Sequence, residues 1–153
     1  GGIRINSAPV VLDHIEIRNN TASDLGGGIS NEKTGSVGGL TIRNSTFLSN
    51  RGAVGGAIDN INDSLAIENT LFDSNMATSG PGGALAQVGP GTINNSRFSH
   101  NTSTTGGGAI AISQNVASPS TTTISHSEIS QNTANSGGLV TLGPWEPRQR
   151  WFQ

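Results

Sequence analysis

The sequence contains no cysteine, which excludes a disulfide framework, a thiolate metal site and a cysteine nucleophile. Charged residues make up only 12% of the chain, and its eight Lys and Arg form no basic stripe, which counts against nucleic-acid binding. No apolar run exceeds a few residues, so we expect no membrane span in this segment. The chain starts at Gly1 with neither Met nor a signal peptide, which suggests a mature product or a piece of something longer.

The chain is instead rich in small and polar residues. Gly, Ser, Thr and Asn make up nearly half of the chain, and that composition taken alone is typical of disorder. The apolar residues argue otherwise, because Ile and Phe recur at fixed positions along the chain. A disordered tract has no reason to repeat such a register.

Two short signals recur along almost the whole sequence. One is a Phe or Ile followed three residues later by Asn, and its five copies end at Asn20, Asn50, Asn75, Asn101 and Asn132. The other is a glycine pair before apolar residues, with copies at Gly27-Gly28, Gly55-Gly56, Gly82-Gly83, Gly107-Gly108 and Gly137-Gly138, and an unpaired copy at Gly1-Gly2-Ile3. The Asn positions lie 30, 25, 26 and 31 residues apart, a period that indicates a solenoid of stacked repeats.

Side-chain alternation distinguishes a β-solenoid from a helical one. Five residues before each Phe or Ile anchor lies another apolar residue, and Asn or His follows it two residues later, as in Leu12/His14, Ile42/Asn44, Ile67/Asn69, Ile93/Asn95 and Ile124/His126. This period of two fits a half-buried strand and not a helix. We predict three short strands per unit: one after the glycine pair, one ending at the Asn/His position, and one through the Phe/Ile anchor.

The predicted fold is all-β, a right-handed parallel β-helix of five to six turns over residues 1–142. The anchors Phe47, Phe72 and Phe98 should stack along the axis, with Ile17 and Ile129 at the ends. The turn residues Asn50, Asn75 and Asn101 should form a ladder whose amides bond from turn to turn. Glycine at the corners should supply backbone angles that residues with a Cβ resist.

The combined pattern resembles that of a known repeat family. Phe-x-x-Asn-x-(Ala/Ser), a short link, Gly-Gly-Ala-(Ile/Leu) and then Ile-x-Asn-Ser-x-Phe is similar to the repeat of the chlamydial polymorphic membrane proteins, which many bacterial surface proteins and autotransporter passengers share. The resemblance covers roughly Gly1 to Leu142, although two Asn signals carry Ile and the last glycine signal reads Gly-Gly-Leu-Val. It implies a β-helix that is extracellular or on the bacterial cell surface, associated with the outer membrane.

Residues 143–153 form a tail outside the repeat, with Trp145 and Trp151, two prolines and two arginines. This tail could cap the last turn, contact another subunit or be a boundary remnant. Within the repeats, length variation concentrates in one connection per turn, with long versions at Ser30–Gly39 and Ile112–Thr123. We interpret these long connections as tolerated insertions or as functional loops on a rigid scaffold.

Candidate chemistry is sparse. Parallel β-helices that cleave polyuronides need clustered carboxylates, but stacking the repeats places opposite charges side by side, as in Asp13-Arg43 and Arg97-Glu128. The local acidic group Asp59, Asp63 and Glu68 is a weak Ca²⁺ candidate beside the simpler interpretation of solvated acids. His14 and His126 share a repeat position four turns apart, so they should fill corners and not share a metal. We expect no cofactor and no catalytic residue.

These observations favour a non-enzymatic extracellular β-helix, either an adhesin or passenger segment or a unit that stacks into a fibre. The alternative is a carbohydrate-binding or carbohydrate-active, pectate-lyase-like β-helix. Expected partners are another protein or a second copy meeting it end to end, with a host or surface glycan as a further candidate. Contact residues for such self-association would be Gly1, Gly2, Ile3, Trp145 and Trp151.

Overall fold

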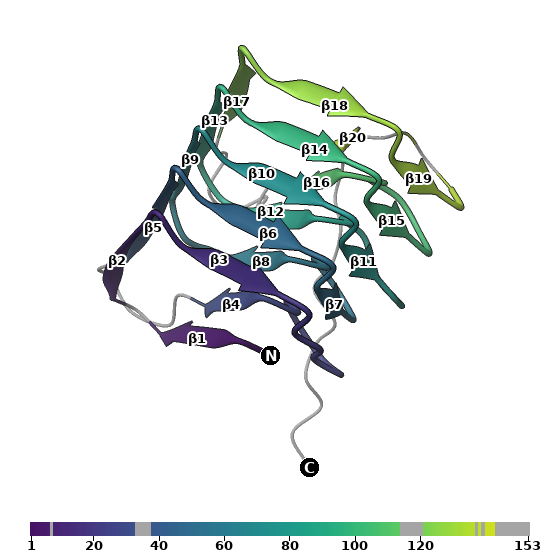
Figure 1. Cartoon of the computed structure of the whole chain (residues 1–153), viewed down its shortest axis with the longest axis horizontal. Coiled ribbons are helices and arrows are strands. Elements are labelled where there is room, and N and C mark those ends of the chain that lie inside the picture. The colour runs from purple at the N-terminus through teal and green to yellow at the C-terminus, as the bar shows by residue number, and fades with distance from the viewer. Residues whose placement is uncertain (7, 33–37, 114–120, 137, 139, 143–153) are drawn as a thin grey trace.

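The computed structural model describes residues 1–153 except 7, 33–37, 114–120, 137, 139 and 143–153. The described residues contain strands, turns and bends but no helix, and the strands wind into a parallel β-solenoid (Figure 1). Accordingly, no helix in this part of the chain has the length and apolar character needed to cross a membrane. The all-β parallel solenoid predicted from the sequence is confirmed.

The strands form four parallel sheets, which we call A to D. Sheet A follows the glycine pairs and comprises β1 (Ile3–Asn6), β4 (Ile29–Glu32), β8 (Ile58–Ile61), β12 (Leu85–Val88), β16 (Ile110–Ser113) and β20 (Val140–Leu142). Sheet B comprises β2 (Pro9–Asp13), β5 (Gly39–Arg43), β9 (Leu65–Glu68), β13 (Gly91–Asn94) and β17 (Thr122–Ser125). Sheet C comprises β3 (Glu16–Arg18), β6 (Thr46–Leu48), β10 (Leu71–Asp73), β14 (Arg97–Ser99) and β18 (Glu128–Ser130). Sheet D comprises β7 (Arg51–Gly52), β11 (Met76–Ala77), β15 (Thr102–Ser103) and β19 (Thr133–Ala134).

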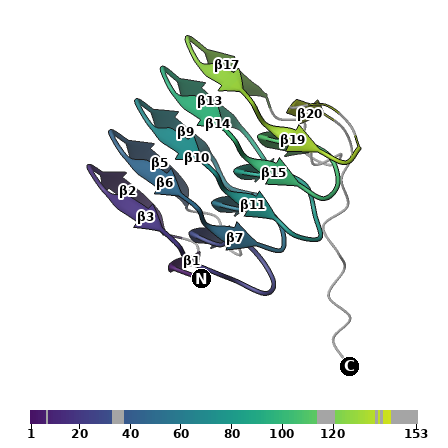
Figure 2. The ribbon, with the colours of Figure 1, turned by 45° about the vertical axis from the view of Figure 1, so that its right-hand side comes forward.

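Successive turns lie side by side and repeat the same path through the four sheets (Figure 2). Complete sets of four strands occur in β4–β7, β8–β11, β12–β15 and β16–β19, so the described chain makes about four full turns. The predictions of three strands per turn and of five to six turns are therefore not confirmed. The extra strands belong to sheet D and are two residues long, too short for side-chain alternation to reveal them. The right-handed coil stays a prediction.

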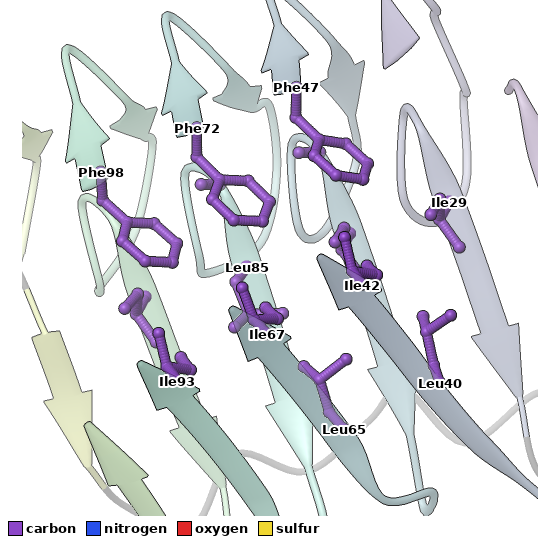
Figure 3. Packing of buried hydrophobic residues seen from close by; sticks show 14 of the residues in the cluster. Ile29, Leu40, Ile42, Phe47, Leu65, Ile67, Phe72, Leu85, Ile93 and Phe98 are labelled. Atoms are coloured by element: carbon purple, nitrogen blue, oxygen red, sulfur yellow. The ribbon is translucent and has the colours of Figure 1, made fainter. Parts of the chain in front are cut away.

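The aromatic column at the centre of the core is confirmed. Phe72 pairs in register with Phe47 on one side and with Phe98 on the other, and all three are fully buried (Figure 3). The ring centroids lie 4.8 and 4.6 Å apart, with interplanar angles of 10° and 5°. Ile17 and Ile129 continue the column, as predicted. Burying each ring stabilises the fold by about 1.5–3 kcal/mol before packing terms.

Aliphatic columns from sheets A and B complete the core (Figure 3). The inward positions of sheet A are Ile29, Ile58, Leu85 and Ile110, and those of sheet B are Leu40, Leu65, Ile42, Ile67 and Ile93. Identical or similar side chains meet at each level because the strands pair in register from turn to turn. The core is therefore one continuous column along the solenoid axis.

Candidate functional site

An internal asparagine ladder borders the phenylalanine column. The Asn50 backbone N–H and its side-chain Nδ2 both donate to Asn75 Oδ1 at 3.0 Å, and Asn75 donates in the same way to Asn101 Oδ1 at 2.9 Å. Asn75 Nδ2 also donates to the Phe47 carbonyl oxygen at 3.0 Å. Asn20 and Asn132 extend the series at the two ends. The predicted ladder is thus confirmed, and it saturates buried backbone groups that would otherwise lack partners.

A second ladder, made of hydroxyl groups, went unpredicted. The Thr70 backbone N–H donates to Ser96 Oγ at 3.1 Å, and the Ser96 N–H donates to Ser127 Oγ at 3.1 Å. The Ile15 N–H donates to Ser45 Oγ at 3.2 Å in the same way. The signal for this ladder was present, because Ser or Thr directly follows the corner Asn or His in four of the five units.

The two positions of each glycine pair require glycine for different reasons. The first glycine of the pair at residues 82–83 has φ of 77°, a left-handed conformation that residues with a Cβ rarely adopt. The second, Gly83, allows close backbone approach, because a Cβ there would lie 2.0 Å from the Gly108 carbonyl oxygen of the next turn. The same combination recurs at Gly55-Gly56 and Gly107-Gly108. These glycines are therefore structural, as predicted.

The corner between sheets B and C carries a third series, exposed to solvent. His14, Asn44, Asn69, Asn95 and His126 all have positive φ, between 47° and 53°. Asn69 Nδ2 donates to Asn44 Oδ1 at 3.2 Å, and Asn44 Nδ2 donates to Asp13 Oδ1 at 2.9 Å. The histidines therefore fill corners, as predicted.

The three acids of the Ca²⁺ candidate do not converge. Asp59 points outward from sheet A and is buried, whereas Glu68 is exposed at the end of β9 in sheet B. Asp63 is buried and accepts hydrogen bonds from Asn31 Nδ2 at 3.1 Å and from the Ser64 backbone N–H at 2.9 Å. No group of three or more His, Cys, Asp or Glu among the described residues could hold a metal ion.

Asp63 instead anchors an internal row of amides that the sequence did not reveal. Asn31, Asn60 and Gln87 occupy one inward register of sheet A. Asn60 Nδ2 donates to Gln87 Oε1 and to the Asp63 carbonyl oxygen, at 2.9 and 2.8 Å. The row ties sheet A to the connection that leads into sheet B.

The exposed charge columns contain ion pairs and no acid cluster. Asp13 accepts from Arg43 Nε at 3.0 Å, and Arg97 Nε lies 3.6 Å from a Glu128 oxygen, so the predicted neighbouring charges are confirmed. The Asn44 hydrogen bond, together with Arg43, holds the pKa of Asp13 below its usual value. Pairs of this kind stabilise charge along a sheet but do not supply an acid and a base facing a substrate.

One carboxylate gathers two hydroxyls and an imidazole. Ser99 Oγ donates to Asp73 Oδ1 at 2.6 Å, and His100 Nδ1 lies 2.8 Å from the same oxygen. Burial raises the pKa of Asp73, but the hydrogen bonds from Ser99, His100 and Ser74 outweigh it and hold the pKa below the usual value. The arrangement lacks the hydroxyl–imidazole contact of a Ser–His pair, because the Ser99 hydroxyl and the His100 ring both bond the Asp73 carboxylate.

Two shallow grooves with a mixed polar and apolar lining follow the solenoid surface. The larger, about 570 Å³, lies along the corner between sheets B and C and is lined by Asn69, Thr70, Leu71, Asn95, Ser96, Arg97, His126 and Glu128. The other, about 350 Å³, includes Gly39, Ser64, Pro90 and Gly91 at the start of sheet B. No aromatic side chain lines either groove, whereas a sugar-binding groove commonly offers one for stacking.

Several predicted features fall partly or wholly outside the described residues. Trp145 and Trp151 lie in the tail, outside the described residues. The central parts of the two long connections, residues 33–37 and 114–120, are also outside the described residues. Of the proposed contact residues, Gly2 and Ile3 lie at the edge of sheet A, where their backbone N–H groups donate to Gly27 and Gly28 carbonyls of the next turn. Gly1 donates through its amino group to the Thr21 carbonyl oxygen at 2.8 Å.

The family comparison agrees with the structural repeat. The Chlamydia polymorphic membrane protein repeat matches residues 14–32 and 95–113, about a quarter of the chain. Both segments begin at the positive-φ corner residue, pass through the sheet C strand, the ladder Asn and the glycine pair, and end with the sheet A strand. The resemblance seen in the sequence is therefore confirmed at two places. No curated protein and no solved structure matches the chain.

Proposed function

We propose that this chain is a non-enzymatic rod segment of a bacterial surface protein, an adhesin or passenger module. The observation that carries the proposal is the coincidence of the two repeat matches with one structural unit that recurs in every turn. Three ladders of side chains and a continuous core are devoted to keeping the turns stacked. Such a scaffold suits display of loops at a distance from the cell.

The connections between strands support display on one side of the rod. Connections from sheet B to sheet C are two residues long in all five units, such as Asn44–Ser45 and Asn69–Thr70. Connections from sheet A to sheet B range from two residues after β12 to eight after β16. Length variation among the repeats is therefore largest at this corner, where a surface protein would place its ligand-binding loops.

Surface exposure tests this proposal directly. Antibodies raised against the purified segment should label intact cells of the encoding bacterium as strongly as permeabilised cells, and external protease should remove the signal. An antibody to a cytoplasmic protein serves as the control. Labelling that requires permeabilisation would contradict a surface location.

The non-enzymatic part of the proposal has its own assay. The purified protein should release no unsaturated or reducing ends from pectin-like polymers, with or without Ca²⁺, because Asp13 and Glu128 of the stacked charge columns pair with arginines and do not face another acid. Calcium-dependent cleavage that is lost in Asp59→Ala or Asp63→Ala would establish the carbohydrate-active alternative instead.

We further propose that the solenoid edges pair with another parallel edge, including that of a second copy. Sheet B has β2 and β17 as its edge strands in this chain, and sheet C has β3 and β18. Unpaired strand edges favour such addition unless they are covered. Light scattering over a range of concentrations, for the full chain and for a variant lacking residues 143–153, should show association of at least one form. If the full chain and the shortened variant both stay monomeric at all concentrations, end-to-end stacking is excluded.

A further inference from the structure

Sheet A differs from sheets B and C because residues on both of its faces are buried along β8, β12 and β16. Ile58, Leu85 and Ile110 point into the core, so strand alternation directs the residues that follow them to the outer face. Those outer residues, Asp59, Ala86 and Ala111, are 0, 0 and 6% exposed. Outward residues of the other sheets, such as Thr92 and Arg97, are exposed.

The glycine loops contribute part of this cover. A Cβ on Gly26 would lie 2.7 Å from the Asp59 backbone nitrogen, and a Cβ on Gly55 would lie 2.9 Å from the same atom. The Asp59 backbone therefore packs against the loop of its own turn and the loop of the preceding turn. The Gly82 loop lies over Ala86 in the same way, with its Cβ position 2.8 Å from the Ala86 nitrogen.

The outward residue of sheet A at these loops is polar in one turn and alanine in the next two. Ala86 and Ala111 suit a dry layer, but Asp59 places a carboxyl group there. Among the residues that the structure describes, neither Asp59 oxygen has a hydrogen-bond partner. A buried carboxylate without partners is costly, whereas the neutral acid is much less so.

The charged groups that act on Asp59 share its sign. Glu32 lies on the neighbouring strand β4, and Asp24 lies in the loop that contains Gly26. Burial first, then the charges of Glu32 and Asp24, raise the pKa of Asp59 to about 8. The Glu32 carboxylate itself pairs with Arg4, at 3.5 Å. Protonation of Asp59 is therefore what makes this packing tolerable near neutral pH.

We propose that Asp59 is a pH-sensitive latch, which holds the loop of residues 22–28 on sheet A while its carboxyl group is neutral and releases that loop when the proton is lost. The change is local because the Gly82 and Gly107 loops of the following turns lie over alanine. A surface or secreted rod could in this way expose the outer face of one turn in an alkaline setting. The inference does not depend on the proposed surface function.

The sign of the effect follows from linkage. The folded protein holds the Asp59 proton up to about pH 8, whereas the unfolded chain releases it near the ordinary value of 3.8. Stability is therefore full below the ordinary pKa, falls as the pH rises between these values, and changes no further above the folded pKa. The folding equilibrium constant should fall by up to about tenfold per pH unit in that window.

Urea unfolding from pH 5 to pH 9 compares the wild type with Asp59→Asn, which keeps the shape and cannot ionise. The folding constant of the wild type divided by that of Asp59→Asn should fall about tenfold for each pH unit and level off above about pH 8. Glu68→Gln, which removes an exposed carboxylate on sheet B, is the matched control and should leave the profile parallel to that of the wild type. Parallel profiles for the wild type and Asp59→Asn would overturn the latch.

Two measurements on the wild type decide the question even if the variant fails to fold. The Asp59 carboxyl carbon should titrate with a midpoint near pH 8 in NMR spectra. Hydrogen exchange, corrected for intrinsic rates, should show Gly27 and Gly28 losing protection between pH 6 and pH 9, because their N–H groups bond the Gly56 and Ala57 carbonyls. The Gly83 amide is the internal control. A midpoint below about 5, or equal protection of all three amides at both pH values, would refute the proposal.

Discussion

Two asparagine ladders run along the same solenoid, one inside it and one on its surface. The inner ladder comprises Asn20, Asn50, Asn75, Asn101 and Asn132. The corner ladder comprises Asn44, Asn69 and Asn95, and its position is taken by His14 and His126 in the outer turns. The inner position is Asn in every unit, whereas the corner position changes its residue type.

The difference lies in what each position demands. An inner Asn accepts from the preceding turn, donates to the following one, and donates again to a buried backbone carbonyl, so only a side chain with both groups fits. A corner residue must adopt positive φ, which Asn and His tolerate better than most residues. A third series, at residues 19, 49, 74, 100 and 131, also has positive φ and accepts Asn, Ser, His and Gln. Positive φ alone is therefore a weak constraint on residue type.

The largest expected effect tests how far the inner ladder depends on the core beside it. Phe72→Ala should destabilise the fold by about 3–5 kcal/mol, because it removes the middle ring of a stacked, fully buried column. The Asn101 amide bonds the Phe72 carbonyl, so the neighbouring ladder should loosen with it. Urea melts measure the loss. Leu71→Ala, an outward position on the same strand, is the control, and an equal loss there would mean that the column is not the core.

The second prediction breaks the inner ladder itself. Asn75→Ala should cost roughly 2–4 kcal/mol, because it leaves the buried Asn50 N–H and Asn101 Oδ1 with one partner fewer. Asn75→Gly should be no better, since the lost groups are the amide nitrogen and oxygen and not a backbone angle. Recovery of stability in the glycine variant would show that conformation, and not hydrogen bonding, selects Asn at this position.

The sequence carried enough information for the inner ladder because its residues are invariant and periodic. The Phe column, the ladder and the glycine pairs all rest on identical side chains meeting in register, and repetition makes that visible. Sheet D stayed hidden, since strands of two residues such as Met76–Ala77 hold no alternation. The amide row of Asn31, Asn60 and Gln87 was hidden because its members differ in type and alternate with apolar residues in other turns.

The buried carboxyl of Asp59 could not be predicted for a different reason. Outward positions on a solenoid strand are normally solvated, as Thr92 is on sheet B and Arg97 is on sheet C. Only the fold of the glycine loops over sheet A reveals that its outer face is covered. A sequence pattern records which residues alternate but not which of the two faces meets water.

A smaller loss of stability is expected from substitutions in the corner ladder. Asn69→Ala should cost about 1 kcal/mol, because alanine resists a φ of 48° and gains nothing from the solvent-exposed amides. Asn69→Gly should be nearly neutral, since glycine adopts this angle freely. The pair of glycine variants at residues 69 and 75 thus separates the two ladders in one set of urea melts. A glycine variant at 69 as unstable as Asn75→Gly would mean that the corner amides, too, are held by their hydrogen bonds.

The smallest effect concerns the charges that border the corner ladder. Arg97→Ala should cost less than about 1 kcal/mol, because Arg97 and Glu128 are more than half exposed and their 3.6 Å contact is screened by water and salt. The loss should shrink further in high salt, as expected for an exposed pair. Glu128→Ala alone and together with Arg97→Ala completes a double-mutant cycle, in which the coupling energy isolates the pair. A coupling energy that stays the same in high salt would mean that the contact between Arg97 and Glu128 is less accessible to water than its exposure indicates. The exposed corner would then be less different from the buried inner ladder.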